Sequence, residues 1–149
     1  MGYKKVRKAN GLDVGQLTHL LIGWLDETEF EYPGYCEYSP LWLADFIYRY
    51  PTFVGEVDGK IIGAIGLKSG SFPWNNEVTC LFCDFLMVDK EFRGNGIATM
   101  LIDEAKKLAD QHEMSLHLGL MTGNKAELKD RFLEISGFMY AGGNFVYTR

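Results

Sequence analysis

The spacing of hydrophobic residues along the chain predicts four helices. Between residues 97 and 111 the apolar positions Ile97, Leu101, Ala105 and Leu108 recur every three or four residues, which is the period of an α-helix. A leucine stripe predicts another helix that starts at an N-cap residue, Asp13, and extends to about residue 25. Further helices are expected at about residues 39–50, which open on Ser-Pro, and at residues 124–136, which end before a glycine.

Strands are predicted where apolar and β-branched residues run together between turn signals. TFVGEV and KIIGAIGL flank Asp58-Gly59, a pair typical of a type I′ hairpin turn. The segment SGSFPWNN is expected to be a loop. Strands are also expected at residues 3–8, 78–88 and 115–121, with a final hairpin around Gly142-Gly143.

The resulting order, βααβββαβαββ, predicts an α+β (mixed α/β) protein with about seven strands and about four helices. One strand–helix–strand crossover should make two strands parallel in an otherwise largely antiparallel sheet. The 149 residues fit one domain, residues 1–149, because a typical domain has about 150 residues.

Composition restricts the partners that we expect. The net charge of −5 disfavours nucleic acid as a partner, because a duplex-binding module normally shows a basic face. No apolar stretch approaches the roughly 20 residues that span a bilayer, so no membrane partner is expected either. The three cysteines, Cys36, Cys80 and Cys83, are an odd number and favour a reducing, cytoplasmic setting. Because the CxxC pair lies in a predicted strand, we interpret its thiols as structural, and no metal site is expected.

The segment with the clearest chemistry is the turn DKEFRGNG, which joins a strand to the helix at residues 97–111. Gly94 and Gly96 lack a Cβ atom, so another group can approach their backbone closely. The first amides of a helix have no intrahelical partner, and the helix dipole adds positive potential there. With Arg93 beside it, this turn predicts a site for phosphate or pyrophosphate, although a simple turn is the alternative. Neither the dinucleotide fingerprint nor a P-loop matches.

The run Arg93-Gly94-Asn95-Gly96-Ile97-Ala98 matches the pattern Gln/Arg-x-x-Gly-x-Gly/Ala. It follows a strand that ends Leu-Met-Val, and downstream Asn124 opens a helix that closes with FLEISGF. Together these segments resemble the GNAT superfamily of acetyl-CoA-dependent N-acetyltransferases, and the resemblance extends over nearly the whole chain. It implies the GNAT fold, a twisted mixed sheet splayed open between its fourth and fifth strands, with acetyl-CoA in the splay.

The resemblance also implies which residues bind the cofactor. The pyrophosphate would lie on amides from Gly94 to Thr99, and the pantetheine arm would pair with the strand backbone before the turn. One strand amide would polarise the thioester carbonyl, as in an oxyanion hole. The expected cofactor-binding residues are Leu86, Met87, Val88, Arg93, Gly94, Asn95, Gly96, Ile97, Ala98, Thr99 and Asn124. Acetyl-CoA would be the co-substrate, and no metal would be needed.

Members of this family often use a carboxylate on the fourth strand as the base, and Asp84 is the candidate here. Asp84 shares strand parity with Leu86 and Val88 and so faces the same side unless a bulge intervenes; a structural role is the alternative. Glu77 is a weaker candidate. Where the family often has a tyrosine as the acid, this chain has Leu133, so Tyr140, Tyr147 or water would protonate the thiolate.

The expected acceptor is a primary amine of a small molecule or peptide. An acidic, tyrosine-rich segment favours a cationic amine, unless it is simply a solvated loop; its residues are Glu27, Glu29, Glu31, Tyr32, Tyr35, Glu37 and Tyr38. The three tryptophans, Trp24, Trp42 and Trp74, and His117 are interpreted as packing residues. The C-terminal VYTR offers a strand edge through which a homodimer could form.

Two other functions stay open at this point. The first is a non-catalytic acyl-CoA-binding sensor or scaffold, which the glycines and Arg93 would serve equally well. The second is a nucleotide-binding protein of another fold, which would make the downstream helix motif accidental.

Overall fold

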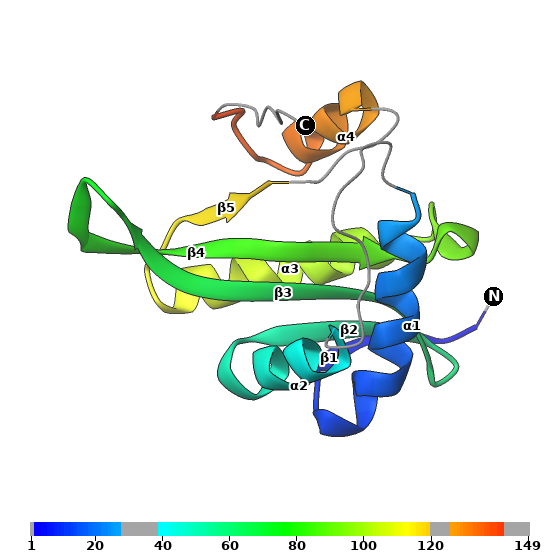
Figure 1. Cartoon of the computed structure of the whole chain (residues 1–149). Helices are drawn as coiled ribbons and strands as arrows, with labels where there is room; N and C mark the ends of the chain where they lie inside the picture. Colours follow the sequence, from blue (N-terminus) through cyan, green and yellow to red (C-terminus); the bar gives the residue numbers. More distant parts are fainter. Residues whose placement is uncertain (1, 28–38, 120–125, 142–149) are drawn as a thin grey trace, which may run out of the picture.

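The computed structural model describes residues 2–27, 39–119 and 126–141, and a single mixed sheet organises them (Figure 1). In the described part the sheet has five strands in the order β1-β2-β3-β4-β5: β1 Lys4–Lys8, β2 Thr52–Val57, β3 Lys60–Phe72, β4 Asn75–Val88 and β5 Leu116–Leu118. The first four strands are antiparallel to their neighbours, and β5 is parallel to β4. The expected mixed sheet with one parallel pair is therefore confirmed.

The helices lie close to their predicted positions: α1 Val14–Leu25, α2 Ser39–Arg49, α3 Ile97–Gln111 and α4 Ala126–Ile135. Short 3₁₀ turns, η1 Gly11–Asp13 and η2 Lys90–Phe92, precede α1 and α3. The end of α4 is set by Gly137 at φ +92°, where the backbone N–H groups of Gly137 and Phe138 donate to the carbonyls of Glu134 and Leu133. This pattern is the Schellman cap that the glycine predicted.

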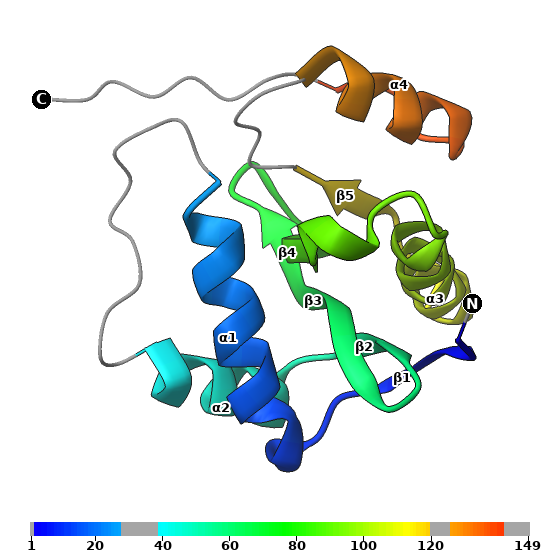
Figure 2. The same ribbon diagram turned by 90° about the vertical axis from the view of Figure 1, so that its right-hand side faces the viewer.

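Helices cover both faces of the sheet, with α1 and α2 on one side and α3 on the other (Figure 2). Each face has its own hydrophobic cluster. The first cluster lies under α1 and α2 and includes Leu17, Leu43, Phe46, Phe85 and Met87. The second lies under α3 and includes Ile62, Ile65, Leu67, Ile97 and Leu101. Because both faces are covered, the middle of β3 is buried on both sides, which explains its continuous apolar run.

The expected count of seven strands is not matched by the described part of the chain. Residues 138–141, where the last hairpin was expected to begin, form no strand, and Gly142-Gly143 and the residues after them lie outside the described residues. The predicted loop SGSFPWNN is also wrong, because β3 continues to Phe72 and β4 begins at Asn75. The rings of Phe72 and Trp74 stack at 4.9 Å between centroids. This aromatic contact stabilises a longer hairpin than the polar and turn-forming residues of the segment predict.

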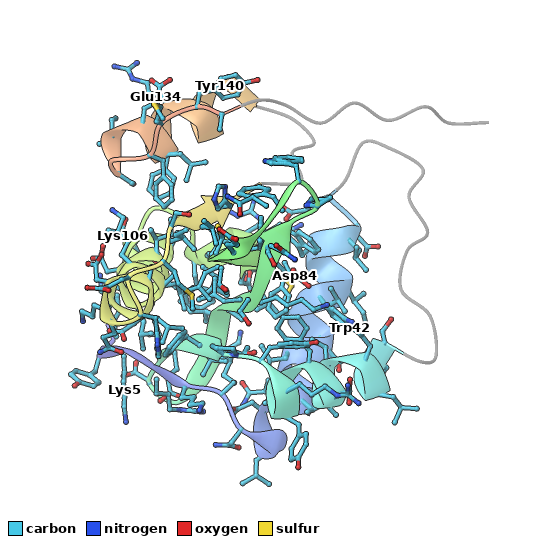
Figure 3. The ribbon with its side chains drawn as sticks, turned by 90° about the vertical axis from the view of Figure 1, so that its left-hand side faces the viewer. Lys5, Trp42, Asp84, Lys106, Glu134 and Tyr140 are labelled. Atoms are coloured by element: carbon cyan, nitrogen blue, oxygen red, sulfur yellow. The ribbon has the colours of Figure 1, made fainter. Side chains whose placement is uncertain are left out.

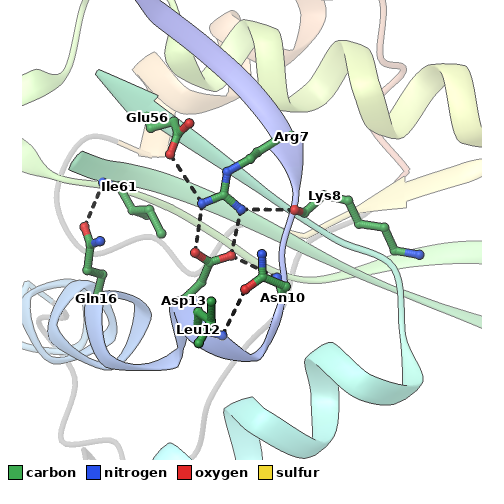
Figure 4. Close-up of polar contacts among 8 residues, drawn as sticks. All are labelled: Arg7, Lys8, Asn10, Leu12, Asp13, Gln16, Glu56 and Ile61. Carbon is green, nitrogen blue, oxygen red and sulfur yellow. Dashed lines mark hydrogen bonds and ion pairs between the residues drawn. The ribbon is translucent and has the colours of Figure 1, made fainter. Parts of the chain in front are cut away.

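A partly buried ion pair between Arg7 and Asp13 ties β1 to the start of α1 (Figure 4). Asp13 is only 4% exposed, and its carboxylate accepts two N–H bonds from the Arg7 guanidinium, both at 2.8 Å, and one from the backbone of Asn10 at 2.9 Å. Arg7 also donates to Glu56 at 3.3 Å. The Arg7 hydrogen bonds hold the pKa of Asp13 below its ordinary value of 3.8, against the opposing effect of burial. Asp13 is the N-cap residue of α1, as predicted, but its side chain makes no cap hydrogen bond to α1 and instead anchors β1.

We expect Asp13→Asn to lower the free energy of unfolding at pH 7 by about 2–3 kcal/mol, because a charge-assisted hydrogen-bond pair is lost at a buried position. A lowered pKa in the folded state means that the wild-type carboxylate stabilises the fold above pH 3.8 and loses this contribution as the pH falls further. Urea unfolding at both pH values should therefore show that wild type and Asp13→Asn differ less in their free energy of unfolding at pH 3 than at pH 7.

The control for this prediction is Asp45→Asn. Asp45 pairs with Arg49 on the exposed surface of α2, at 2.9 Å, with both side chains more than half exposed. Its loss should change the stability by no more than about 0.5 kcal/mol. Equal effects of the two substitutions would show that the Asp13 network does not anchor β1.

Candidate active site

The C-terminal end of β4 has one edge without a neighbouring strand in the described part of the chain. β5 pairs with β4 only from Leu81 to Cys83. From Phe85 to Val88, β4 still pairs with β3, but it has no strand partner on the β5 side within the described residues. A stretch of β4 backbone that includes the predicted positions Leu86, Met87 and Val88 is therefore free of strand pairing on one side.

A β-bulge lies where this free edge begins. Gly66 is opposite Phe85 and Leu67 is opposite Cys83, so Asp84 is the extra residue on β4. A Cβ atom on Gly66 would lie 2.3 Å from the Phe85 ring, so only glycine lets that ring lie against β3 at this point. The bulge thus depends on the pairing of β4 with β3.

The bulge changes the side to which Asp84 points. Cys83, Leu86 and Val88 pack against the cluster under α3, whereas Phe85 belongs to the cluster under α1 and α2. Alternation along the strand breaks at the bulge, and Figure 3 shows Asp84 on the side of β4 nearer Trp42 than Lys106. Asp84 therefore does not face the same side as Leu86 and Val88, which is the exception that an intervening bulge allows. Its carboxylate is exposed, on the face that α1 and α2 border.

The thiols near the bulge are not poised for chemistry. The Cys83 thiol donates to the Phe85 carbonyl at 3.3 Å, across the bulge. Burial, with a contribution from the charge of Asp84, raises the pKa of Cys83 to about 12, so the thiol is neutral at pH 7. Cys80 is buried and accepts a hydrogen bond from Ser115. Both thiols are free, and the described residues contain no cluster suited to a metal ion.

The two glycines of the turn after β4 adopt the left-handed backbone conformation that glycine tolerates best. Gly94 and Gly96 have φ angles of +81° and +89°, and α3 begins directly afterwards. The Asn95 side chain accepts a hydrogen bond from the Ile97 amide at 3.2 Å. No partner for the amides of Gly96, Ala98 or Thr99 exists among the described residues. These free N–H groups at the positive end of the helix dipole suit an anion.

Two glycines in the sheet let the first turn of α3 come close to the strands. A Cβ atom on Gly55 or Gly63 would lie 2.8 or 2.9 Å from Cγ2 of Ile97. Any larger residue at these positions would push the start of α3 away from the sheet. The free amides are therefore held beside the end of β4 by packing on β2 and β3.

The charged groups near the turn differ from the expected arrangement. The Arg93 guanidinium donates twice to the Val88 carbonyl, at 3.2 and 3.0 Å, and pairs with Glu27 after α1. The positive charge of Arg93 is thus already paired with the Glu27 carboxylate. A different cation, Lys4 on β1, donates from Nζ to the Asn95 carbonyl in the turn. The two residues are 91 positions apart, and no local sequence signal relates them.

The other residues predicted for the catalytic site either do not lie beside Asp84 or fall outside the described residues. Tyr140 is 67% exposed beyond α4, and Figure 3 draws it well apart from Asp84. Glu77 is exposed near the start of β4. Several predicted positions lie outside the described residues, namely Asn124, Tyr147 and the acidic and tyrosine positions from Glu29 to Tyr38.

The aromatic residues pack as interpreted from the sequence. The Trp42 ring lies 5.5 Å from Phe46 and 5.9 Å from Phe85 between centroids, and it remains 45% exposed. His117 on β5 stacks on Phe82 at 5.1 Å and contacts the Ser115 hydroxyl at 3.1 Å. Trp42 therefore forms a half-exposed aromatic surface on the same face of the sheet as Asp84.

Fold and site together define a class: an α+β protein with an open strand edge that leads into an anion-suited turn and helix. The sequence profile of the acetyltransferase (GNAT) family matches residues 19–135. The chain therefore belongs to the GNAT acetyltransferase family, and the enzyme class expected from the sequence is confirmed.

Solved structures with the same fold cover nearly the whole chain. An acetyltransferase from Trypanosoma brucei is 20% identical with a TM-score of 0.74, covering 99% of this chain and 100% of its own. The aminoglycoside N-acetyltransferase AAC(6')-Iy, in complex with the bisubstrate analogue CoA-S-monomethyl-acetylneamine, is 16% identical with a TM-score of 0.76 and coverages of 99% and 98%. A ribosomal-protein-alanine N-acetyltransferase from Brucella melitensis is 16% identical with a TM-score of 0.72 and covers 99% of both chains.

These likenesses confirm the GNAT fold. No curated protein sequence matches the chain. In the described part of the chain, no helix has both the length and the apolar character needed to cross a membrane.

Proposed function

We propose that this acetyltransferase transfers the acetyl group of acetyl-CoA to a primary amine by direct attack in a ternary complex. The observation that carries the proposal is the continuity of the free β4 edge with the free amides of the glycine turn. The pantetheine arm would pair along Leu86 to Val88, and the pyrophosphate would accept hydrogen bonds from amides between Gly94 and Thr99. Family membership favours this enzyme over a non-catalytic acyl-CoA-binding module.

In the proposed reaction the amine nitrogen forms a bond to the acetyl carbon while the carbon–sulfur bond breaks. An amide of the β4 edge polarises the thioester carbonyl as negative charge develops on its oxygen. Asp84 takes the proton that the amine must lose, directly or through a water molecule, because its carboxylate is exposed at the start of the open edge. The leaving thiolate takes a proton from water, since Leu133 stands at the family tyrosine position and Tyr140 lies elsewhere.

A cationic amine is the acceptor that the surroundings of Asp84 support best. Asp84 is an exposed carboxylate, and the half-exposed ring of Trp42 lies on the same face of the sheet. A carboxylate attracts a cation, and an aromatic face adds a cation–π contact. The structural likeness to AAC(6')-Iy makes small polycationic amines such as aminoglycosides the first acceptors to test, with peptide amines second.

The test measures acetyl-CoA binding by isothermal titration and then thiol release from acetyl-CoA with a panel of amines. The panel holds aminoglycosides, polyamines and peptides with free N-termini, and N-acetylated versions of the same compounds serve as matched controls. We expect acetyl-CoA to bind and at least one cationic amine to release thiol, while its acetylated form releases none. Tight binding without release by any amine would support the non-catalytic module, and absence of binding would overturn the cofactor assignment.

A further inference from the structure

The side chain of Lys4 reaches from β1 to the glycine turn at the start of α3. Lys4 lies near the start of β1, paired with Val57 of β2, and its ammonium group donates to the backbone carbonyl of Asn95. A Cβ atom on Gly96 would lie 3.7 Å from this Nζ, the one contact within 4 Å that it would make with described residues other than its chain neighbours. Lys4 is half-buried, and its hydrogen bond falls on the peptide group that joins Asn95 to Gly96.

The geometry of a peptide bond makes this contact consequential. The described residues contain no cis peptide, so the Asn95 carbonyl and the Gly96 N–H point in opposite directions. Holding the carbonyl on the β1 side turns the Gly96 N–H away from β1. That N–H has no partner within the described part of the chain, and it sits at the amino end of α3.

We propose that Lys4 is a positioning residue that fixes the Asn95–Gly96 peptide so that the Gly96 amide presents its hydrogen to the pyrophosphate of acetyl-CoA. This inference rests on the function proposed above, since it assigns a role in binding the same co-substrate. It adds a residue from the first strand, which lies outside the strand–turn–helix motif.

The turn needs an external contact because its own sequence makes it adaptable. Gly94 and Gly96, on either side of Asn95, populate many backbone angles, so the peptide between them can rotate at little cost. The side-chain oxygen of Asn95 already accepts a hydrogen bond from the Ile97 amide. The backbone carbonyl of Asn95 accepts from a different donor, Lys4. A turn held in the binding geometry before the ligand arrives loses less entropy on binding, which strengthens affinity.

The experiment compares Lys4→Met with Lys5→Met, its neighbour on β1. Both substitutions remove one positive charge, but Lys5 is exposed on the opposite face of the strand and has no side-chain hydrogen bond to the described residues. We expect Lys4→Met to weaken acetyl-CoA binding about tenfold, the effect of one charge-assisted hydrogen bond, while Lys5→Met leaves it unchanged. Lys4→Arg should restore most of the affinity, because it keeps a charged donor.

Two further readouts separate positioning from a general charge or folding effect. In a ¹⁵N–¹H NMR spectrum of the free protein, the Gly96 amide signal should move in Lys4→Met and stay in Lys5→Met. The kcat/KM for S-acetylpantetheine, which has no pyrophosphate, should be the same in wild type and Lys4→Met. Lys4→Gln, which removes the charge and shortens the side chain, should show the same losses and replaces Lys4→Met if that variant does not fold.

Distinct outcomes would overturn the inference. Unchanged acetyl-CoA affinity in Lys4→Met, or an equal loss in Lys5→Met, would remove the positioning role. An equal loss with S-acetylpantetheine would show a structural role alone. If the wild type did not bind acetyl-CoA, the proposed function would fail instead, and an unmoved Gly96 signal would then independently contradict the orienting contact.

Discussion

Replacing Gly96 by tryptophan is expected to weaken acetyl-CoA binding by about 100-fold. Gly96 has φ +89°, a region that costs other L-residues about 1–2 kcal/mol. The Cβ atom at this position would already be in van der Waals contact with Lys4 Nζ, at 3.7 Å, so the bulky indole beyond it also crowds that ammonium group. Either change moves the peptide whose amide faces the proposed pyrophosphate, so at least one charge-assisted hydrogen bond of about 1.5–3 kcal/mol is lost. Together these costs amount to about two orders of magnitude in the dissociation constant.

The measurement is isothermal titration of acetyl-CoA into both proteins, with circular dichroism to show that the variant is folded. Gly59→Trp is the matched control, because Gly59 has a similar φ of +82° in the β2–β3 turn and a Cβ there would meet no described residue within 4 Å besides its chain neighbours. The control should bind acetyl-CoA like the wild type. Wild-type affinity in Gly96→Trp would mean that the pyrophosphate lies elsewhere, and an equal loss in Gly59→Trp would indicate backbone strain alone.

The second large effect is expected from Asp84→Asn, which should lower kcat by about 10²- to 10³-fold and leave the dissociation constant of acetyl-CoA unchanged. Asparagine has nearly the same shape as aspartate and preserves the bulge, but it cannot accept the proton of the amine. The loss should shrink at high pH, where the amine is already neutral and needs no base. A pH profile of kcat from pH 7 to pH 10 with one active amine therefore tests the role of the carboxylate.

Glu77→Gln is the control for this substitution, because it makes the same charge change on the same strand, at an exposed position near the other end. Its kcat should stay within about twofold of the wild type, as expected for a surface carboxylate away from the reaction. Turnover by Asp84→Asn at the wild-type rate would show that Asp84 has the structural role left open by the sequence. A loss that is constant across the pH range would argue against proton transfer as its task.

Local signals in the sequence were sufficient for most elements. Asp58 and Gly59 have φ angles of +49° and +82°, the left-handed pair of the predicted hairpin turn. The apolar period of α3 placed its ends correctly, and Gly137 placed the end of α4. Each of these depends on residues within a few positions of one another. The longer β3–β4 hairpin was missed because stacking of Phe72 and Trp74 outweighs the turn propensity of the residues between the strands.

The sequence by itself determined the strand, the glycine turn and the helix that make the anion-suited site, since φ preferences and free helix amides are local properties. Only the tertiary structure decided where the groups around this site point. The bulge that turns Asp84 away from α3 depends on how β4 pairs with Gly66 of β3. The partners of Arg93 and the contact of Lys4 with Asn95 join distant parts of the chain. Such contacts follow from strand register and helix packing, which no short stretch of sequence contains.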